Sequence, residues 1–220
     1  MTKQIQAALA MIESGMAISL GGGNHIKQLA QAIAASSLTD LRICSPSEAT
    51  VATCRELGLT VDLDLTATDI AFDGCDQVTK GFDALKSGGA IFTYEKRNAM
   101  LSQQFVLLVG ADRYVPDFNG QVPLTIEALD AAIPLVQQVA AQFHTTAKVR
   151  EASNYMGFTR TRDGNKVIDL QLPPETKGHD FTQRLESLPG VVATSLFEGL
   201  VTTILLKTTD GNIQRIERTH

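Results

Sequence analysis

The chain has no tryptophan, and aromatic residues make up only 5% of its 220 residues. The commonest residue for stacking on a ring-shaped ligand is therefore missing. Positive charge is also in short supply, because 19 lysines and arginines face 24 aspartates and glutamates, for a net charge of −5. A nucleic-acid surface needs a concentrated basic stripe. We therefore expect no nucleic-acid partner, and any anionic ligand has to be held by local donors.

Cysteines are few, and long apolar runs are absent. The three cysteines, Cys44, Cys54 and Cys75, form no C-x-x-C pair, which favours unpaired thiols in a reducing compartment over disulfides or zinc. No apolar stretch approaches the roughly 18 residues of a membrane span, and residues 1–6 lack the layout of a signal peptide. We expect a cytoplasmic protein with no metal site and no membrane contact.

The order of apolar and helical patterns predicts the fold class. With 44% hydrophobic residues, the chain can bury a sizeable core. In the first half, strand-like runs alternate with helical patterns, which predicts an α/β fold: a mostly parallel open sheet with helices on both faces. The expected strands are 16–20, 41–44, 60–63, 70–72 and 105–109, and the expected helices are 4–12, 24–35, 47–57 and 88–101.

After Pro123 the pattern changes to an α+β order. Helical patterns cover 130–143 and 181–188, strand-like runs cover 191–196 and 200–207, and Asp163-Gly164-Asn165 is a turn signal. We expect a main, catalytic α/β domain of residues 1–127 and 203–220. A smaller α+β domain of residues 128–202 would act as a lid or in oligomerisation. The segment 210–218 is expected to return to the main domain or pair with its edge.

Three carboxylates and one lysine follow the strand expected at 70–72. Asp73-Gly-Cys-Asp76 comes directly after it, Lys86-Ser-Gly-Gly89 comes next, and Glu95 lies in the following helix. Open α/β sheets place their sites in the crevice beyond the carboxyl ends of the strands, so we expect these groups to face a pocket and to transfer protons. Taken singly, the aspartates are more often turn residues, Lys86 a solvated cation and Glu95 a surface ion-pair partner. Their joint order behind a strand favours a site.

The segment Gly21-Gly22-Gly23-Asn24 stands between the first expected strand and a helix. Glycines let backbone N–H groups approach an anion, and a helix N-terminus adds unpaired donors. The segment is neither a Rossmann fingerprint, because Ile26 stands where a third glycine would fall, nor a P-loop. A tight turn is the plain alternative, and His25 either binds the anion or faces solvent. Ser45 and Ser47 repeat the arrangement after the second strand, where an ordinary N-cap is the alternative.

Several motifs follow one another along the chain: strand-Gly-x-Gly, Ser-x-Ser-x-x-Thr, Asp-Gly-x-Asp, Lys-x-Gly-Gly-Ala with a nearby Glu-Lys, and Val122-Pro-Leu-x-Ile-Glu127. In this order they resemble the type A ribose-5-phosphate isomerases. The resemblance extends through Asp163-Gly-Asn165, Ile168-Asp169 and Leu188-Pro-Gly-Val-Val192, and so covers nearly the whole chain. Its specific part is Asp73 to Asp76 together with Lys86 to Ala90 and Glu95.

The resemblance implies the cofactor-free interconversion of ribose 5-phosphate and ribulose 5-phosphate through an enediolate. It implies that Glu95 carries a proton between C1 and C2 and that Lys86 stabilises the enediolate oxyanion. Asp73 and Asp76 would handle hydroxyl protons and ring opening. It also implies a homodimer or homotetramer with a sugar phosphate as its small-molecule partner. The residues expected to bind the substrate are Gly22, Gly23, Asn24, His25, Ser45, Ser47, Ser87, Gly88, Gly89 and Gln121.

Several positions depart from the family pattern, mostly at anion-binding positions. The first loop usually reads Gly-Thr-Gly-Ser-Thr in relatives but is Gly21-Gly-Gly-Asn-His25 here, which removes its three hydroxyl donors. Gln77, Ser87 and Gln121 replace a usual glutamate, glycine and lysine. An isomerase of a related sugar phosphate and a non-catalytic sugar-phosphate sensor are therefore alternatives. An acyl- or CoA-transferase is another, because Glu95 can in principle accept an acyl group.

Overall fold

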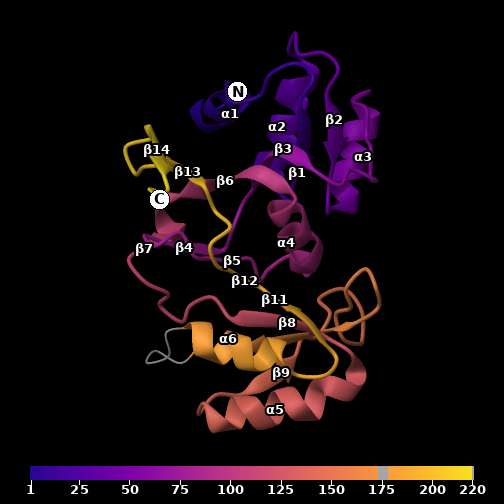
Figure 1. The fold of residues 1–220 in the computed structure, drawn as a ribbon, viewed down its shortest axis with the longest axis vertical. Coiled ribbons are helices and arrows are strands. Elements are labelled where there is room, and N and C mark those ends of the chain that lie inside the picture. The colour runs from indigo at the N-terminus through magenta and orange to yellow at the C-terminus, as the bar shows by residue number, and fades with distance from the viewer. Residues whose placement is uncertain (173–177, 220) are drawn as a thin grey trace.

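A computed structural model describes residues 1–172 and 178–219, which form one large and two smaller sheets (Figure 1). The large sheet has the order β14-β13-β6-β3-β1-β2, and its neighbours are parallel except β14, which pairs antiparallel with β13 at the edge. Its strands are β1 (Ala17–Leu20), β2 (Arg42–Cys44), β3 (Thr68–Asp73), β6 (Ser102–Gly110), β13 (Thr203–Lys207) and β14 (Ile213–Glu217). The expected α/β class and the return of the closing segment to the sheet edge are confirmed.

Helices cover both faces of the large sheet. On one side pack α1 (Lys3–Leu9), α2 (Asn24–Ala34) and α3 (Glu48–Glu56), and on the other packs α4 (Phe92–Met100). Along β6, Val106 and Leu108 join the first core, whereas Phe105 and Leu107 join the core that holds Phe92. Alternate residues of a strand point to opposite faces, so a strand buried on both sides reads as a continuous apolar run. In the residues described, no helix has the length and apolar character that crossing a bilayer requires.

The second sheet is antiparallel and lies at the far end of the molecule from α1, α2 and α3 (Figure 1). Its order is β11-β8-β10-β9, built from β8 (Leu124–Ala128), β9 (Ala147–Val149), β10 (Lys166–Leu170) and β11 (Val191–Thr194). A short η2 (Asp130–Ala132) precedes α5 (Ile133–Gln142), which packs with α6 (Gly178–Glu186) over the core of this sheet. The domain limits expected at residues 127 and 202 stay a prediction, and β8 crosses the first of them.

A third sheet of very short strands lies between the other two, and no sequence signal marks it. Its order is β12-β5-β4-β7, with β4 (Gln77–Thr79), β5 (Ala84–Leu85), β7 (Tyr114–Val115) and β12 (Leu196–Phe197), and η1 (Ala111–Arg113) leads into β7. Only Ser195 separates β11 from β12, and its carbonyl accepts the N–H of Lys86 at 3.0 Å. One segment therefore belongs to both smaller sheets and fixes the backbone of Lys86.

Two expected elements are wrong in part. The strand expected at 60–63 is reduced to a single bridge between Val61 and Ile43, because the Asp62 carboxylate accepts the N–H of Asp64 at 3.1 Å and turns the chain. The helix expected at 88–101 begins only at Phe92. Ala90, with φ of 55°, is in the left-handed region, so the residues after Gly88 form a loop instead.

Candidate active site

Lys86 lies between two buried carboxylates that come from different elements. Its Nζ is 2.9 Å from Oδ2 of Asp73 and 3.3 Å from Oε1 of Glu95, and it donates to the carbonyl of Gly74 at 2.5 Å. Asp73 ends β3, Lys86 follows β5 directly, and Glu95 is in the first turn of α4. All three side chains are at most 7% exposed. The structure therefore brings together three of the four residues for which the sequence predicts catalysis.

The Asp73 carboxylate is held by the turns at the ends of two neighbouring strands. Its Oδ1 accepts the N–H of Gly74 at 2.8 Å and the N–H of Gly22 at 3.3 Å, while Oδ2 faces Lys86. The Gly22 turn is in turn fixed by Thr50, whose hydroxyl donates to the carbonyl of Gly21 at 2.7 Å. Asp73 is thus fixed in place by backbone donors.

Burial and charge set the proton affinities of the cluster. Burial raises the pKa of Glu95 to about 8, and the negative charge of Asp73 adds to the rise while Lys86 opposes it. Burial by itself lowers the pKa of Lys86, but the charges of Asp73 and Glu95 outweigh burial and raise it. Near neutral pH, Glu95 can therefore take up and release a proton while Lys86 stays an ammonium.

Asp76 is bound to the loop that follows Lys86. Its Oδ2 accepts the N–H of Ser87 at 2.7 Å and that of Gly88 at 2.8 Å. The hydroxyl of Ser87 donates to the carbonyl of Pro123 at 2.5 Å and lies 2.9 Å from that of Ser195. The side chain of Ser87 therefore bonds to the protein interior. The carboxylate of Asp76 holds the backbone N–H groups of the loop.

A cavity of about 670 Å³ opens over this cluster. All four predicted catalytic residues line it, as do four of the predicted substrate-binding residues: Gly22, Gly23, Ser47 and Gly89. Ser47 also caps α3, because its Oγ accepts the N–H of Thr50 at 3.3 Å. The N-cap alternative is therefore correct for Ser47. As an N-cap, Ser47 still lies on the cavity wall.

The other predicted binding residues do not line the cavity. Asn24 and His25 are exposed in the first turn of α2. The Ser45 hydroxyl donates to the carbonyl of Gly21 at 3.4 Å, and exposed Gln121 donates its N–H to Asn119 Oδ1 at 3.1 Å. Gly88 is placed by Asp76, as described above. The first loop therefore presents backbone groups of Gly22 and Gly23 to the cavity.

Part of the cavity lining consists of residues that sequence reasoning missed. Arg113 comes from η1, and the stretch Thr159 to Arg162 precedes β10. The guanidinium of Arg162 stacks on Tyr94, with its Cζ 5.1 Å from the ring centroid. The available signal was the pair of arginines flanking Thr161 just before the predicted turn. The segment η1 and the stretch before β10 therefore add arginines to a cavity that Asp73, Asp76 and Glu95 also line.

The described residues hold three buried cysteines and no side-chain cluster arranged for a metal ion. Cys75 lies between the two aspartates, but burial raises its pKa to about 12, so it stays a neutral thiol. Cys44, Cys54 and Cys75 are all buried and unpaired. Within residues 1–172 and 178–219, no group of three or more His, Cys, Asp or Glu side chains is arranged to hold a metal ion.

Comparison with known proteins gives one consistent family. The family model described as ribose 5-phosphate isomerase A (phosphoriboisomerase A) matches residues 42–211. The ribose-5-phosphate isomerase A of Prochlorococcus marinus strain MIT 9312 is 30% identical over 96% of this chain and 93% of its own length. That of Pyrococcus furiosus is also 30% identical, over 97% of this chain and 95% of its own. A solved D-ribose-5-phosphate isomerase in complex with phospho-erythronic acid has a TM-score of 0.91 and 25% identity, over 98% of this chain and 96% of that one.

Proposed function

The chain belongs to the ribose 5-phosphate isomerase A family, and on that basis we propose that the cavity over Lys86 is where it interconverts ribose 5-phosphate and ribulose 5-phosphate. One observation carries the assignment: a buried ammonium within 3.3 Å of two carboxylates, one of which has a pKa of about 8. An aldose-ketose isomerase needs a base and a cation of this kind, because a proton next to a carbonyl is removed only when the developing oxyanion is stabilised.

Glu95 is the base that moves the carbon-bound proton. Its carboxylate takes the proton from C2 of the open-chain aldose, the C2–H electron pair forms the C1–C2 double bond, and the carbonyl oxygen on C1 becomes the oxyanion. Lys86 faces that oxygen with its ammonium. When Glu95 returns the proton to C1 and the hydroxyl proton moves from O2 to O1, the ketose results. Positioned base catalysis of this kind contributes about 10²–10⁴-fold to the rate.

Asp73 and Asp76 are assigned to the hydroxyl protons. Both line the cavity, and both are held by backbone N–H groups in a fixed position. A carboxylate fixed at the cavity wall can pass a proton between O1 and O2 of the enediolate and can assist opening of the sugar ring. In the case of Asp73, its ion pair with Lys86 also keeps the ammonium aimed at the oxyanion.

The phosphate end of the substrate is assigned to the cavity wall formed by Gly22, Gly23 and the three arginines Arg113, Arg160 and Arg162. The first turn of α2 has no side-chain cap and no acidic residue, so its N–H groups and the helix dipole favour an anion. Arginine guanidinium groups bind phosphate through charge-assisted hydrogen bonds. They compensate for the three hydroxyls that the loop Gly21 to His25 lacks.

The test is to incubate the protein with a panel of pentose and hexose phosphates in deuterated water and to record which C–H position exchanges. Exchange at C1 and C2 of ribose 5-phosphate is expected, and Glu95→Gln should slow it about 10²–10⁴-fold. Preferred exchange of another sugar phosphate would instead support the alternative substrate that the altered loop suggests. Binding of ribose 5-phosphate without any exchange would support the sensor and contradict the proposal.

The assembly implied by the family resemblance and the compartment expected from the composition belong to the same proposal. A homodimer or homotetramer is to be checked by light scattering of the purified chain. Residence in the cytoplasm is supported by three buried and unpaired cysteines, because cytosolic thiols are kept reduced.

A further inference from the structure

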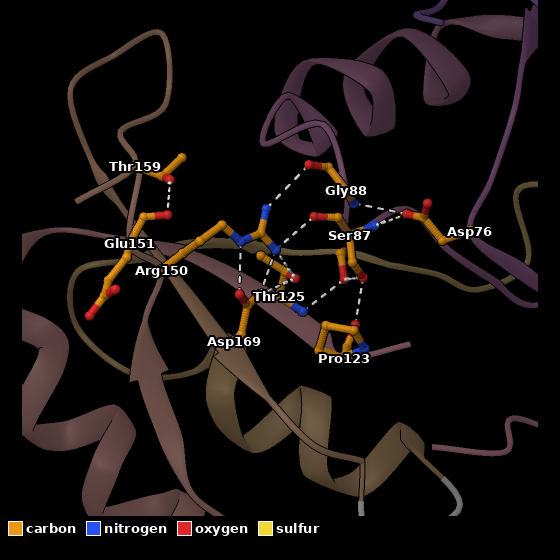
Figure 2. Close-up of polar contacts among 10 residues, drawn as sticks. Asp76, Ser87, Gly88, Pro123, Thr125, Arg150, Glu151, Thr159 and Asp169 are labelled. Atoms are coloured by element: carbon orange, nitrogen blue, oxygen red, sulfur yellow. Dashed lines mark hydrogen bonds and ion pairs between the residues drawn. The ribbon is translucent and has the colours of Figure 1, made fainter. Parts of the chain in front are cut away.

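Arg150 joins the second sheet to the loop that carries Lys86 (Figure 2). Its Nη2 donates to the carbonyl of Ser87 at 2.8 Å and its Nη1 to that of Gly88 at 3.3 Å. Asp76 binds the N–H groups of the same two residues. Figure 2 shows Arg150 and Asp76 on opposite sides of this short loop. The loop is therefore held by a cation on its carbonyl groups and by an anion on its N–H groups.

Arg150 is itself fixed by Asp169 of β10. The Nε and Nη2 of Arg150 lie 2.7 Å and 2.5 Å from the two oxygens of the Asp169 carboxylate, a bidentate geometry that only arginine can make. Thr125 of β8 accepts from Nη2 at 3.0 Å and donates to Asp169 at 2.7 Å. The pair is mostly shielded from solvent, with 19% and 28% of the side chains exposed.

The backbone of Arg150 also anchors the wall of the cavity. Its N–H donates to the carbonyl of Val167, and its carbonyl accepts the N–H of Thr159, both at 2.8 Å. Thr159 begins the stretch that lines the cavity. The same residue thus links the Lys86 loop to the stretch Thr159 to Arg162 that lines the cavity.

We propose that Arg150, oriented by Asp169, is a positioning residue that holds the Lys86 loop at the reactive distance from Glu95. The proposal rests on the function proposed above. Arg150 does not line the cavity, so it acts through the carbonyls of Ser87 and Gly88. The second sheet is then part of the catalytic scaffold, because the Arg150 side chain next to it fixes the position of the Lys86 ammonium.

Loosening the loop has a consequence for the proton affinity of Glu95. The charged groups packed around Glu95 are Asp73 from β3, which raises its pKa, and Lys86 from the end of β5, which lowers it. If Lys86 moves away, its lowering effect on the pKa of Glu95 is lost, whereas the raising effect of Asp73 remains. The pH at which activity rises should therefore shift upward in a variant that frees the loop.

The test compares Arg150→Lys and Asp169→Asn with the control Arg215→Lys, which alters an exposed ion pair to Glu217 on β14. Lysine keeps the charge of Arg150 but has no planar fork to reach Asp169 and two carbonyls together. We expect kcat to fall about 100-fold in Arg150→Lys, the size of loss that a small misplacement of a reacting group produces, with KM changed far less. Both single variants disrupt the same Arg150–Asp169 ion pair. The fold-loss of kcat in the double variant should therefore be much smaller than the product of the two single fold-losses.

Amide hydrogen exchange of Ser87 and Gly88, followed by NMR, provides a readout that does not depend on turnover. Both N–H groups should exchange faster in Arg150→Lys than in the parent, and the control should match the parent in exchange, kcat and pH profile. Parent-like exchange and kcat in Arg150→Lys, with only a lower melting temperature, would overturn the proposal. Faster exchange in Arg150→Lys, together with a parent protein that turns over no sugar phosphate, would support the positioning of the loop and would refute the isomerase assignment instead.

Discussion

A Cβ atom at position 21 would lie only 2.0 Å from Cγ of Asp73 and 2.2 Å from its Oδ1. Gly21 donates its N–H to the carbonyl of Phe72 at 2.8 Å, so the turn after β1 packs directly on the end of β3. The absence of a side chain at Gly21 is therefore what lets the Asp73 carboxylate occupy its position beside Lys86.

Replacing Gly21 by alanine should displace Asp73 and disturb the ion pair with Lys86. We expect kcat to fall about 100-fold, because the reacting groups lose their alignment, together with a lower melting temperature. Gly81→Ala is the matched control, since a Cβ there would meet only Thr79 Oγ1 at the ordinary distance of 3.5 Å. A Gly21→Ala protein with unchanged kcat would contradict this account of Asp73.

Replacing Lys86 by methionine removes the ammonium and keeps most of the side-chain volume. The oxyanion loses its counter-charge, so kcat should fall by about 10²–10³-fold. Asp73 and Glu95 are then left facing each other in a buried site, and breaking a buried pair costs about 3–5 kcal/mol. Urea unfolding at pH 9 should show this loss of stability, and the loss should be smaller at pH 6, where Glu95 is protonated. Equal losses at both pH values would argue against the charge of Glu95 as the cause.

Activity should rise with pH through the pKa of Glu95. Burial and Asp73 raise that pKa to about 8, and only the ionised carboxylate can accept the C2 proton. The Lys86 ammonium stays charged over this range because its pKa is raised. We expect kcat/KM to increase between pH 6 and pH 9 along a single ionisation. A flat profile over this interval would show that another group is the base.

The same carboxyl should make the protein less stable as pH rises. A Glu95 pKa raised from 4.5 to about 8 means that the folded state binds a proton that the unfolded state has already released. Stability therefore falls with increasing pH between these two values. Glu95→Gln removes this dependence. The melting temperature of the variant minus that of the parent should therefore be larger at pH 9 than at pH 5. The reverse order would mean that Glu95 is ionised in the folded protein at low pH.

Replacing Arg162 by glutamine tests the assignment of the lining arginines Arg113, Arg160 and Arg162 to the phosphate. Charge-assisted hydrogen bonds contribute about 1.5–3 kcal/mol, so KM for ribose 5-phosphate should rise about tenfold or more, with kcat changed little. Inhibition by inorganic phosphate should weaken in parallel. Arg215→Gln on β14 serves as the control for removal of an exposed arginine. An unchanged KM would show that Arg162 does not bind the phosphate.

Predictions that depend on local pattern were largely correct. The apolar runs before Gly21, Cys44 and Asp73 form parallel strands because such runs are stable only when both faces are covered. Ser47 begins α3 because its hydroxyl caps a free N–H. The errors at 60–63 and 88–91 arose where side chains compete with regular structure: Asp62 turns the backbone, and Asp76 captures the N–H groups of Ser87 and Gly88.

The alternation of the main strands and helices, the family, and the Asp-Gly-x-Asp, lysine and glutamate motifs behind one strand could all be read from the sequence, because each is recognised from residues close together in the chain. Which distant groups meet depends on how the sheets pack against each other. Arg150 and Asp169 reach the Lys86 loop from another sheet, and three arginines line the same cavity as the acidic cluster. The proton affinity of Glu95 also depends on the fold, because desolvation follows from how completely the surrounding elements exclude water, and no local sequence pattern specifies that.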